Sequence, residues 1–129
     1  MVGIIVVSHG YMAQESVKSA HMLVGECESL AYEGIQPGEP PEVFFERVKA
    51  IADQVDDGSG IVALVDLFGG TPNNTVYRLK REKNVRIIAG FNLPMLIHAI
   101  TERMPETTQA ELVEELLSVG ASEIREFGC

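Results

Sequence analysis

The chain has 129 residues, of which 46% are hydrophobic and 22% are charged, and this composition is typical of one globular domain with a single core. Its formal net charge of −9 argues against a nucleic-acid partner, because phosphate contacts require a concentration of Lys and Arg. The apolar run at the start is too short to span a bilayer and no basic region precedes it. We therefore expect no direct membrane insertion and a cytoplasmic location.

The first half of the chain predicts alternating strands and helices. Residues 2–7 are apolar and rich in β-branched side chains, which is typical of a strand buried on both faces of a parallel sheet. Helical spacing of apolar residues then predicts a helix over 13–24, and a shorter strand follows over 30–33. A proline-rich turn precedes a second helix over 42–55.

The second half repeats this alternation. The predicted elements are a strand over 61–65, a helix that ends near 81, a strand over 85–90, a helix from about 94 to 103, a helix over 109–119 and a short strand over 122–127. The apolar helix segment 94–100 suits the core better than a dimer interface. The whole pattern predicts an α/β fold in one domain over 1–129: four parallel strands in a central sheet, helices on both faces, and a short antiparallel fifth strand near the C-terminus.

Polar side chains follow three of the predicted strands: His9, Asp66 and Asn92. The carboxyl ends of parallel strands meet at one edge of the sheet, where ligands and catalytic groups gather, so we expect these residues at the same edge. Asp66 has two interpretations, a simple loop cap or a carboxylate that accepts a ring N–H from His9. In the second case the other ring nitrogen keeps its lone pair exposed, which suits a nucleophile, a base or a metal ligand.

The segment GGTPNN offers a candidate anion site. Thr71 is a good N-cap and Pro72 a good first helical residue, so a helix is predicted to begin here. Gly69 and Gly70 would present unhindered N–H groups, and together with Asn73 they form a natural seat for a phosphoryl group. The alternative is a capped helix after a tight turn. Nucleotide binding is poorly supported, because no phosphate-binding P-loop or dinucleotide fingerprint occurs in the sequence.

Two other kinds of site are weaker hypotheses. Ser8, His9 and Asp66 contain the residue types of a hydrolytic triad, but adjacent residues of a strand point to opposite faces and no G-x-S-x-G elbow is present. The other histidines, His21 and His98, are scattered on predicted helices. The sequence predicts no metal site and no cofactor.

The cysteines also lack the spacing of metal ligands. Cys27 and Cys129 are far apart in the sequence, and we expect a reduced setting for both. Cys129 is expected to be an exposed thiol.

Taken together, these segments resemble the IIA component of the mannose family of the bacterial phosphoenolpyruvate-dependent sugar phosphotransferase system. The matching pieces, in order, are IIVVSHG, MLVGE, PGE, VALVDLFGGTP and IAGFNLPML. The resemblance covers nearly the whole chain. Each piece alone is a weak signal, and their common order and spacing make the match specific.

The resemblance implies a phosphotransferase component with a phosphohistidine intermediate. In that family the histidine matching His9 accepts a phosphoryl group from the histidine-containing phosphocarrier protein and passes it to the IIB component. The aspartate matching Asp66 hydrogen-bonds the histidine, and the hydroxyl residue matching Thr71 lies beside the phosphoryl group. Family members are homodimers, some of which exchange a terminal strand, so we expect a homodimer.

The physical interpretation and the resemblance combine into one hypothesis. Asp66 holds one ring nitrogen of His9 protonated, and Nε2 attacks the phosphorus of the donor. Partners would dock on Met12, Leu67 and Phe68, although Phe68 suits the core equally well. Because no Ala/Pro-rich hinge precedes the end of the sequence, the IIB component is expected to be a separate chain, unless a IIB domain has been removed.

Two competing functions stay open. The same fold occurs in the phosphoryl-donor subunit of the phosphoenolpyruvate-dependent dihydroxyacetone kinase, and a related protein could instead signal its phosphorylation state to a regulator. The GGTP and FNLPM segments favour the sugar-transport branch. A plain ligand-binding domain is the third alternative.

Overall fold

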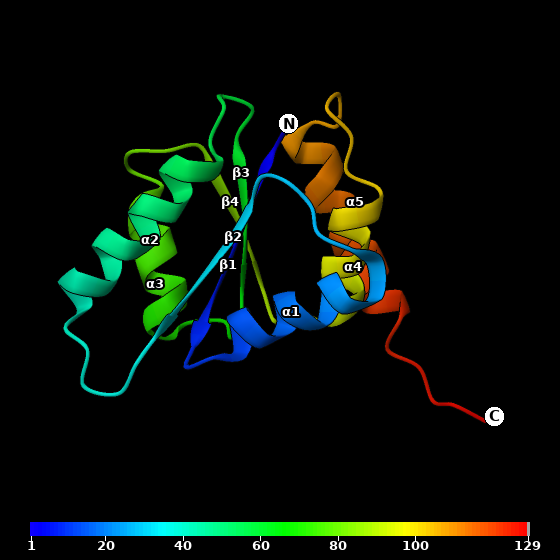
Figure 1. Cartoon of the computed structure of the whole chain (residues 1–129), viewed down its shortest axis with the longest axis horizontal. Helices are drawn as coiled ribbons and strands as arrows, with labels where there is room; N and C mark the ends of the chain where they lie inside the picture. The colour runs from blue at the N-terminus through cyan, green and yellow to red at the C-terminus, as the bar shows by residue number, and fades with distance from the viewer. Residues whose placement is uncertain (129) are drawn as a thin grey trace.

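The computed structural model describes residues 1–128 and is built around one sheet of four parallel strands (Figure 1). The strands are β1 (Gly3–His9), β2 (Leu30–Ile35), β3 (Ile61–Val65) and β4 (Val85–Ala89), in the spatial order β2-β1-β3-β4. The two central strands, β1 and β3, are buried along their length except at His9. This burial on both faces explains why their sequences are unbroken apolar runs.

Five helices cover the two faces of the sheet (Figure 1). One layer contains α1 (Met12–Val24), α4 (Leu93–Thr101) and α5 (Gln109–Ser122), and the other contains α2 (Pro41–Val55) and α3 (Gly70–Leu79). The predicted α/β fold with helices on both faces is thus confirmed. The bounds of the elements differ from the predicted ones by a few residues, chiefly at strand and helix ends.

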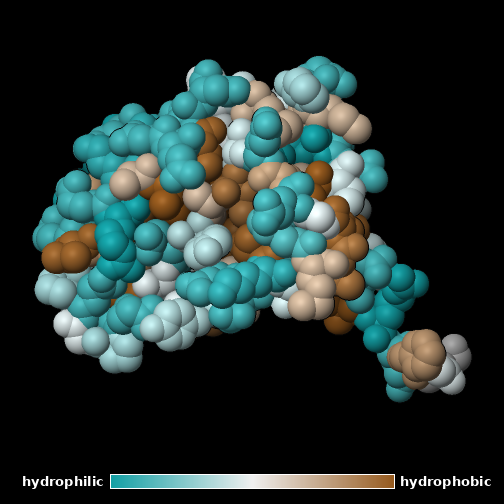
Figure 2. Space-filling model, viewed as in Figure 1, coloured by the Kyte–Doolittle hydropathy of each residue, from teal (hydrophilic) through white to brown (hydrophobic). Residues whose placement is uncertain are grey.

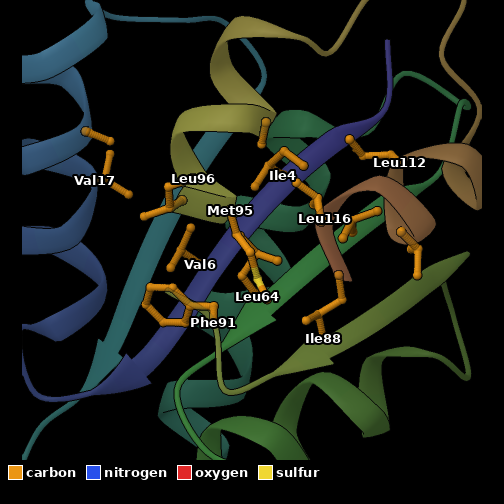
Figure 3. Close-up of a cluster of buried hydrophobic side chains, with 14 of the residues drawn as sticks. Ile4, Val6, Val17, Leu64, Ile88, Phe91, Met95, Leu96, Leu112 and Leu116 are labelled. Carbon is orange, nitrogen blue, oxygen red and sulfur yellow. The ribbon is translucent and has the colours of Figure 1, made fainter. Parts of the chain in front are cut away.

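The alternation of side chains along β1 separates two apolar cores. Ile4 and Val6 point into the cluster under α1, α4 and α5, whereas Ile5 and Val7 point into the cluster under α2 and α3. Figure 3 shows the first cluster, in which strand side chains meet Leu96 of α4 and the α5 leucines. The predicted core placement of segment 94–100 is confirmed, since Met95, Leu96 and Ala99 are buried.

The predicted fifth strand is wrong for this single chain. Helix α5 extends to Ser122, and residues 123–128 that follow form neither helix nor strand. This segment leaves the body of the protein (Figures 1 and 2), and Ile124 and Phe127 in it are 76% and 101% exposed. A strand requires a neighbouring strand to satisfy its N–H and C=O groups, and this segment has no such neighbour here.

A buried arginine fixes the end of the sheet where the strands begin. Arg103 is 6% exposed and donates hydrogen bonds to the carbonyl oxygens of Val2 (2.6 Å), Glu28 (2.7 Å) and Ser29 (2.9 Å). Its guanidinium also contacts the half-buried Cys27 thiol, whose pKa is raised by burial in spite of the nearby positive charge. Cys129 lies outside the described residues.

Two adjacent leucines of α5 provide a matched test of the core. Leu116 is fully buried against the sheet, whereas Leu117 is 52% exposed. We expect Leu116→Ala to lower the free energy of unfolding by about 2–5 kcal/mol, because it leaves a cavity that the neighbouring side chains fill only in part. Leu117→Ala should change it by about 0.5 kcal/mol or less. Urea denaturation of both variants measures the difference, and equal losses would contradict this packing.

Candidate functional site

The connections that follow β1 and β3 leave the sheet toward opposite faces. The connection after β1 leads to α1 on one face, and the connection after β3 leads to α3 on the opposite face (Figure 1). The two connections therefore diverge between neighbouring strands, and such a switch point is where open parallel sheets bind ligands. His9 is the last residue of β1, and Asp66 directly follows β3.

His9 and Asp66 are held together by two hydrogen bonds to one oxygen. Asp66 Oδ2 accepts the backbone N–H of His9 at 2.9 Å and lies 2.8 Å from the ring atom Nδ1. Because a carboxylate oxygen only accepts, this contact needs a proton on Nδ1, and in the neutral form of the ring Nε2 then keeps its lone pair. The Asp66 side chain is only 10% exposed, whereas that of His9 is 52% exposed. A largely covered carboxylate therefore holds an imidazole that is open to solvent.

The start of α3 lies against the free edge of the imidazole. A Cβ atom built on Gly70 would lie 3.4 Å from Cε1 and 3.7 Å from Nε2 of His9. Gly69 and Gly70 have φ angles of 81° and 77°, a left-handed conformation that side-chain-bearing residues rarely adopt. The glycine pair thus lets the first turn of α3, with its free N–H groups and positive dipole end, come close to Nε2.

The predicted N-cap at Thr71 is wrong. Helix α3 begins at Gly70, and Gly69 occupies the N-cap position without any side-chain cap. The left-handed backbone of the two glycines starts the helix earlier than helix propensity suggests, so Thr71 lies inside the first turn. Thr71 is half-buried and lines a cavity of about 250 Å³ between α2 and α3, together with Phe45 and Arg78.

Asn73 lines a groove next to the glycine pair, whereas Asn92 caps a helix. Asn73 is half-buried and lines a groove of about 670 Å³ beside β4, together with Phe68 and Gly69. The side chain of Asn92 caps α4 by accepting the N–H of Met95 at 3.2 Å, and it donates to the carbonyl oxygen of Gly120 at 2.9 Å. Of the three polar residues expected at this edge, the structure brings His9 and Asp66 together and gives Asn92 a structural role.

The hydrolytic alternative conflicts with the position of Ser8. Ser8 is fully buried, and its hydroxyl is engaged by the backbone rather than by the His9 ring. A nucleophilic serine must reach both a substrate and a base, and this one reaches neither.

The other histidines lie away from this site. His98 on α4 lies 3.1 Å from Glu115 on α5, and His21 lies on α1. Within residues 1–128, no group of three or more His, Cys, Asp or Glu side chains is arranged to hold a metal ion. Over the same residues, no helix is both long and apolar enough to cross a membrane.

Exposed apolar side chains follow both central strands. Met12 is 48% exposed, Leu67 58% and Phe68 89%, so the alternative that placed Phe68 in the core is wrong. Tyr11, which is 64% exposed, belongs to the same group, and sequence reasoning did not single it out. The signal that could have identified Tyr11 is its position two residues after His9, in the same connection. The site is therefore an exposed imidazole with apolar neighbours along the chain.

Comparison with known proteins identifies the family of the chain. A family model described as the PTS (phosphotransferase system) fructose IIA component matches residues 3–117, and the chain belongs to this family of mannose- and fructose-type IIA components. The resemblance inferred from the sequence motifs is thus confirmed.

Relatives and solved structures extend over nearly the whole chain. The mannose-specific EIIAB component of Escherichia coli K12 is 32% identical over 125 residues, which cover 96% of this chain and 39% of that protein, so the chain spans only part of the curated relatives it matches. The mannose/sorbose-specific IIA subunit from Enterococcus faecalis superimposes with a TM-score of 0.88 at 29% identity, covering 99% of this chain and 96% of that one. The IIA protein associated with the fucose utilization operon of Streptococcus pneumoniae gives 0.83 at 30% identity, covering 98% and 96%.

The His9–Asp66 contact predicts the tautomer of the imidazole. At a pH where His9 is neutral, its proton should lie on Nδ1, because Asp66 Oδ2 accepts it. In Asp66→Ala this preference should be lost. Long-range ¹H–¹⁵N spectra distinguish the two tautomers, and the His21 and His98 signals serve as internal controls. A His9 ring protonated on Nε2 in the unchanged protein would contradict the geometry.

Proposed function

We propose that the chain is a phosphohistidine carrier that accepts a phosphoryl group on His9 from the histidine-containing phosphocarrier protein and passes it to a IIB component, for the uptake and phosphorylation of a sugar. The observation that carries this proposal is the position of His9. Its Nδ1 is held by a buried carboxylate, while its Nε2 faces the start of a helix. Membership of the IIA family supports the same chemistry.

The transfer step needs one nucleophile and no proton acceptor. The Nε2 lone pair of neutral His9 attacks the phosphorus of the donor phosphohistidine, a new N–P bond forms, and the donor's own N–P bond breaks. The donor ring, which carries a proton on its other nitrogen, takes the electron pair of that bond and leaves as neutral imidazole. The His9 ring, which keeps its Nδ1 proton, gains positive charge, and the Asp66 carboxylate 2.8 Å away balances it.

The phosphoryl oxygens would lie at the start of α3. The backbone N–H groups of Gly69, Gly70, Thr71 and Asn73 and the Thr71 hydroxyl are the proposed donors, since Pro72 between them has no N–H. A helix N-terminus contributes about 0.3–1 kcal/mol to an anion at an exposed site, so its main role here would be alignment. Neither the segment around His9 nor GGTPNN contains an arginine, which suits a carrier that must release its cargo.

The partners would dock on the exposed apolar side chains next to the site. Met12 with Tyr11 on one side and Leu67 with Phe68 on the other extend from the two connections that carry His9 and Asp66. Apolar residues of this kind lose contact with water when a partner binds, and they leave the imidazole free to meet a second histidine. We propose that the protein acts in the cytoplasm and that the IIB component is a separate chain.

A homodimer is the proposed assembly, through the segment 123–128. β4 is an edge strand, and the groove of about 670 Å³ beside it has a mixed lining, with Ile87, Tyr77 and Phe68 next to polar and charged side chains such as Lys80 and Arg86. Exposed edges and exposed apolar side chains both favour pairing with another chain. We propose that Ile124 and Phe127 of a second copy cover this edge.

Phosphoryl labelling tests the carrier role. Incubation with phosphoenolpyruvate, enzyme I and the phosphocarrier should give an acid-labile, base-stable label on the protein and none on His9→Ala. Asp66→Asn should fold normally and accept the label roughly 10- to 100-fold more slowly, because the ring is no longer held by a carboxylate. His98→Ala is the matched control and should label like the unchanged protein. Full labelling of His9→Ala would remove His9 from the reaction.

The dimer proposal is tested by mass under native conditions. The unchanged protein should be a dimer at micromolar concentration, and the double variant Ile124→Ser/Phe127→Ser should be a monomer. Met22→Ser, which alters an 86% exposed methionine on α1, is the control and should stay dimeric. A dimer that survives the double substitution would place the interface elsewhere.

A further inference from the structure

Ser8 is a fully buried polar residue and the second-last residue of β1. Its hydroxyl accepts the backbone N–H of Ala13 at 2.8 Å and donates to the carbonyl oxygen of His9 at 3.0 Å. Both neighbours are backbone groups, so the bonds fix the course of the chain rather than the position of another side chain. The carbonyl oxygen of His9 therefore accepts a hydrogen bond from the side chain of the preceding residue.

The same hydroxyl caps α1 from outside the helix. Tyr11 occupies the N-cap position of α1 but makes no side-chain cap, and Ala13 is the second residue of the helix. The first N–H groups of a helix have no partner within it, so an outside acceptor is required when they are buried. Ser8 supplies that acceptor and joins the start of α1 to the end of β1.

These contacts leave His9 with a single free polar atom. Asp66 accepts from its N–H and its Nδ1, and Ser8 donates to its carbonyl oxygen. Over residues 1–128, Nε2 is the polar atom of His9 for which the structure shows no hydrogen-bond partner. The residue is thus held from two sides, by Asp66 at the ring and by Ser8 at the following peptide.

We propose that Ser8 is a positioning residue for the transfer reaction, which holds the His9 peptide so that Nε2 stays aimed at the phosphoryl position. This rests on the proposed carrier function of His9. The peptide after His9 needs its own hydrogen bonds because the next residue, Gly10, restrains the backbone little. The φ angle of Gly10 is 55°, in the left-handed region, and glycine has the widest range of allowed backbone angles. The N–H of the peptide between His9 and Gly10 donates to the carbonyl oxygen of Ile35 at 2.8 Å, and without the Ser8 hydroxyl this is the one remaining hydrogen bond that the structure shows for that peptide within residues 1–128.

Loss of the hydroxyl should affect the rate more than partner binding. Ser8 is 0% exposed and cannot contact a partner, so its substitution removes no contact with a docked protein. A small misplacement of a reacting atom can cost up to about 100-fold in rate. We expect Ser8→Ala to lower kcat for phosphoryl transfer roughly 10- to 100-fold, with the KM for the phosphocarrier unchanged.

The experiment compares three variants with the unchanged protein, at a temperature where circular dichroism shows all of them folded. Ser8→Ala removes the hydroxyl, Ser8→Thr keeps it, and Ser19→Ala removes an exposed hydroxyl from α1 as the matched control. Transfer from the phosphocarrier gives kcat and KM, and long-range ¹H–¹⁵N spectra report the His9 ring without any transfer. Ser8→Thr and Ser19→Ala should keep the unchanged kcat to within a factor of about two.

The spectra separate failure of this inference from failure of the carrier function. In Ser8→Ala the His9 ring signals should shift or broaden while those of His21 and His98 stay in place. Unchanged His9 signals in Ser8→Ala, or a kcat equal to that of the unchanged protein, would overturn the positioning role. A folded Ser8→Thr as slow as Ser8→Ala would overturn it as well. If the unchanged protein accepts no phosphoryl group, the carrier function fails, and the spectra alone then decide whether Ser8 orients His9.

Discussion

A single oxygen of Asp66 that accepts both the N–H and the Nδ1 proton of His9 is the interaction on which the site depends. It requires β1 and β3 to be adjacent and in the correct register. Val7 pairs with Val65 at the end of the β1–β3 ladder, which places His9, two residues further along, within reach of Asp66, one residue further along. The burial of both strands between two helix layers holds this register, because a slip of one residue would exchange the side chains that pack into the two different cores.

The connections after β1 and β3 lead to opposite faces of the sheet, and this divergence places the start of α3 beside His9 as the second part of the site. α1 and α3 leave on opposite faces, and the glycine pair at the start of α3 lies close to the imidazole, since a Cβ atom on Gly70 would be 3.4 Å from Cε1 of His9. The Nδ1 side of the His9 ring therefore lies against a negative carboxylate, and the Nε2 side lies near the positive end of a helix dipole. A ring that gains positive charge and a phosphoryl group that carries negative charge are both accommodated by this arrangement.

The sequence predicted those parts of the fold and the site that depend on the local pattern of apolar and polar residues. The buried runs before His9 and Asp66 fixed the strands, and parallel topology then placed both residues at one edge. The errors concern contacts that are distant in sequence or depend on backbone conformation. The partner of Asn92 is Gly120, 28 residues away, and the start of α3 depends on the left-handed backbone of Gly69 and Gly70. A strand pattern at 122–127 carries no information about which edge, if any, lies beside it.

The central claim is that Asp66 reserves Nδ1 of His9 and leaves Nε2 as the atom that carries the phosphoryl group. The most direct measurement is the NMR spectrum of the phosphorylated protein labelled with ¹⁵N-histidine, in which phosphorus–nitrogen coupling identifies the bonded atom. We expect the phosphorus on Nε2 of His9 and a proton on Nδ1. Phosphorus on Nδ1, or on any residue other than His9, would contradict the account.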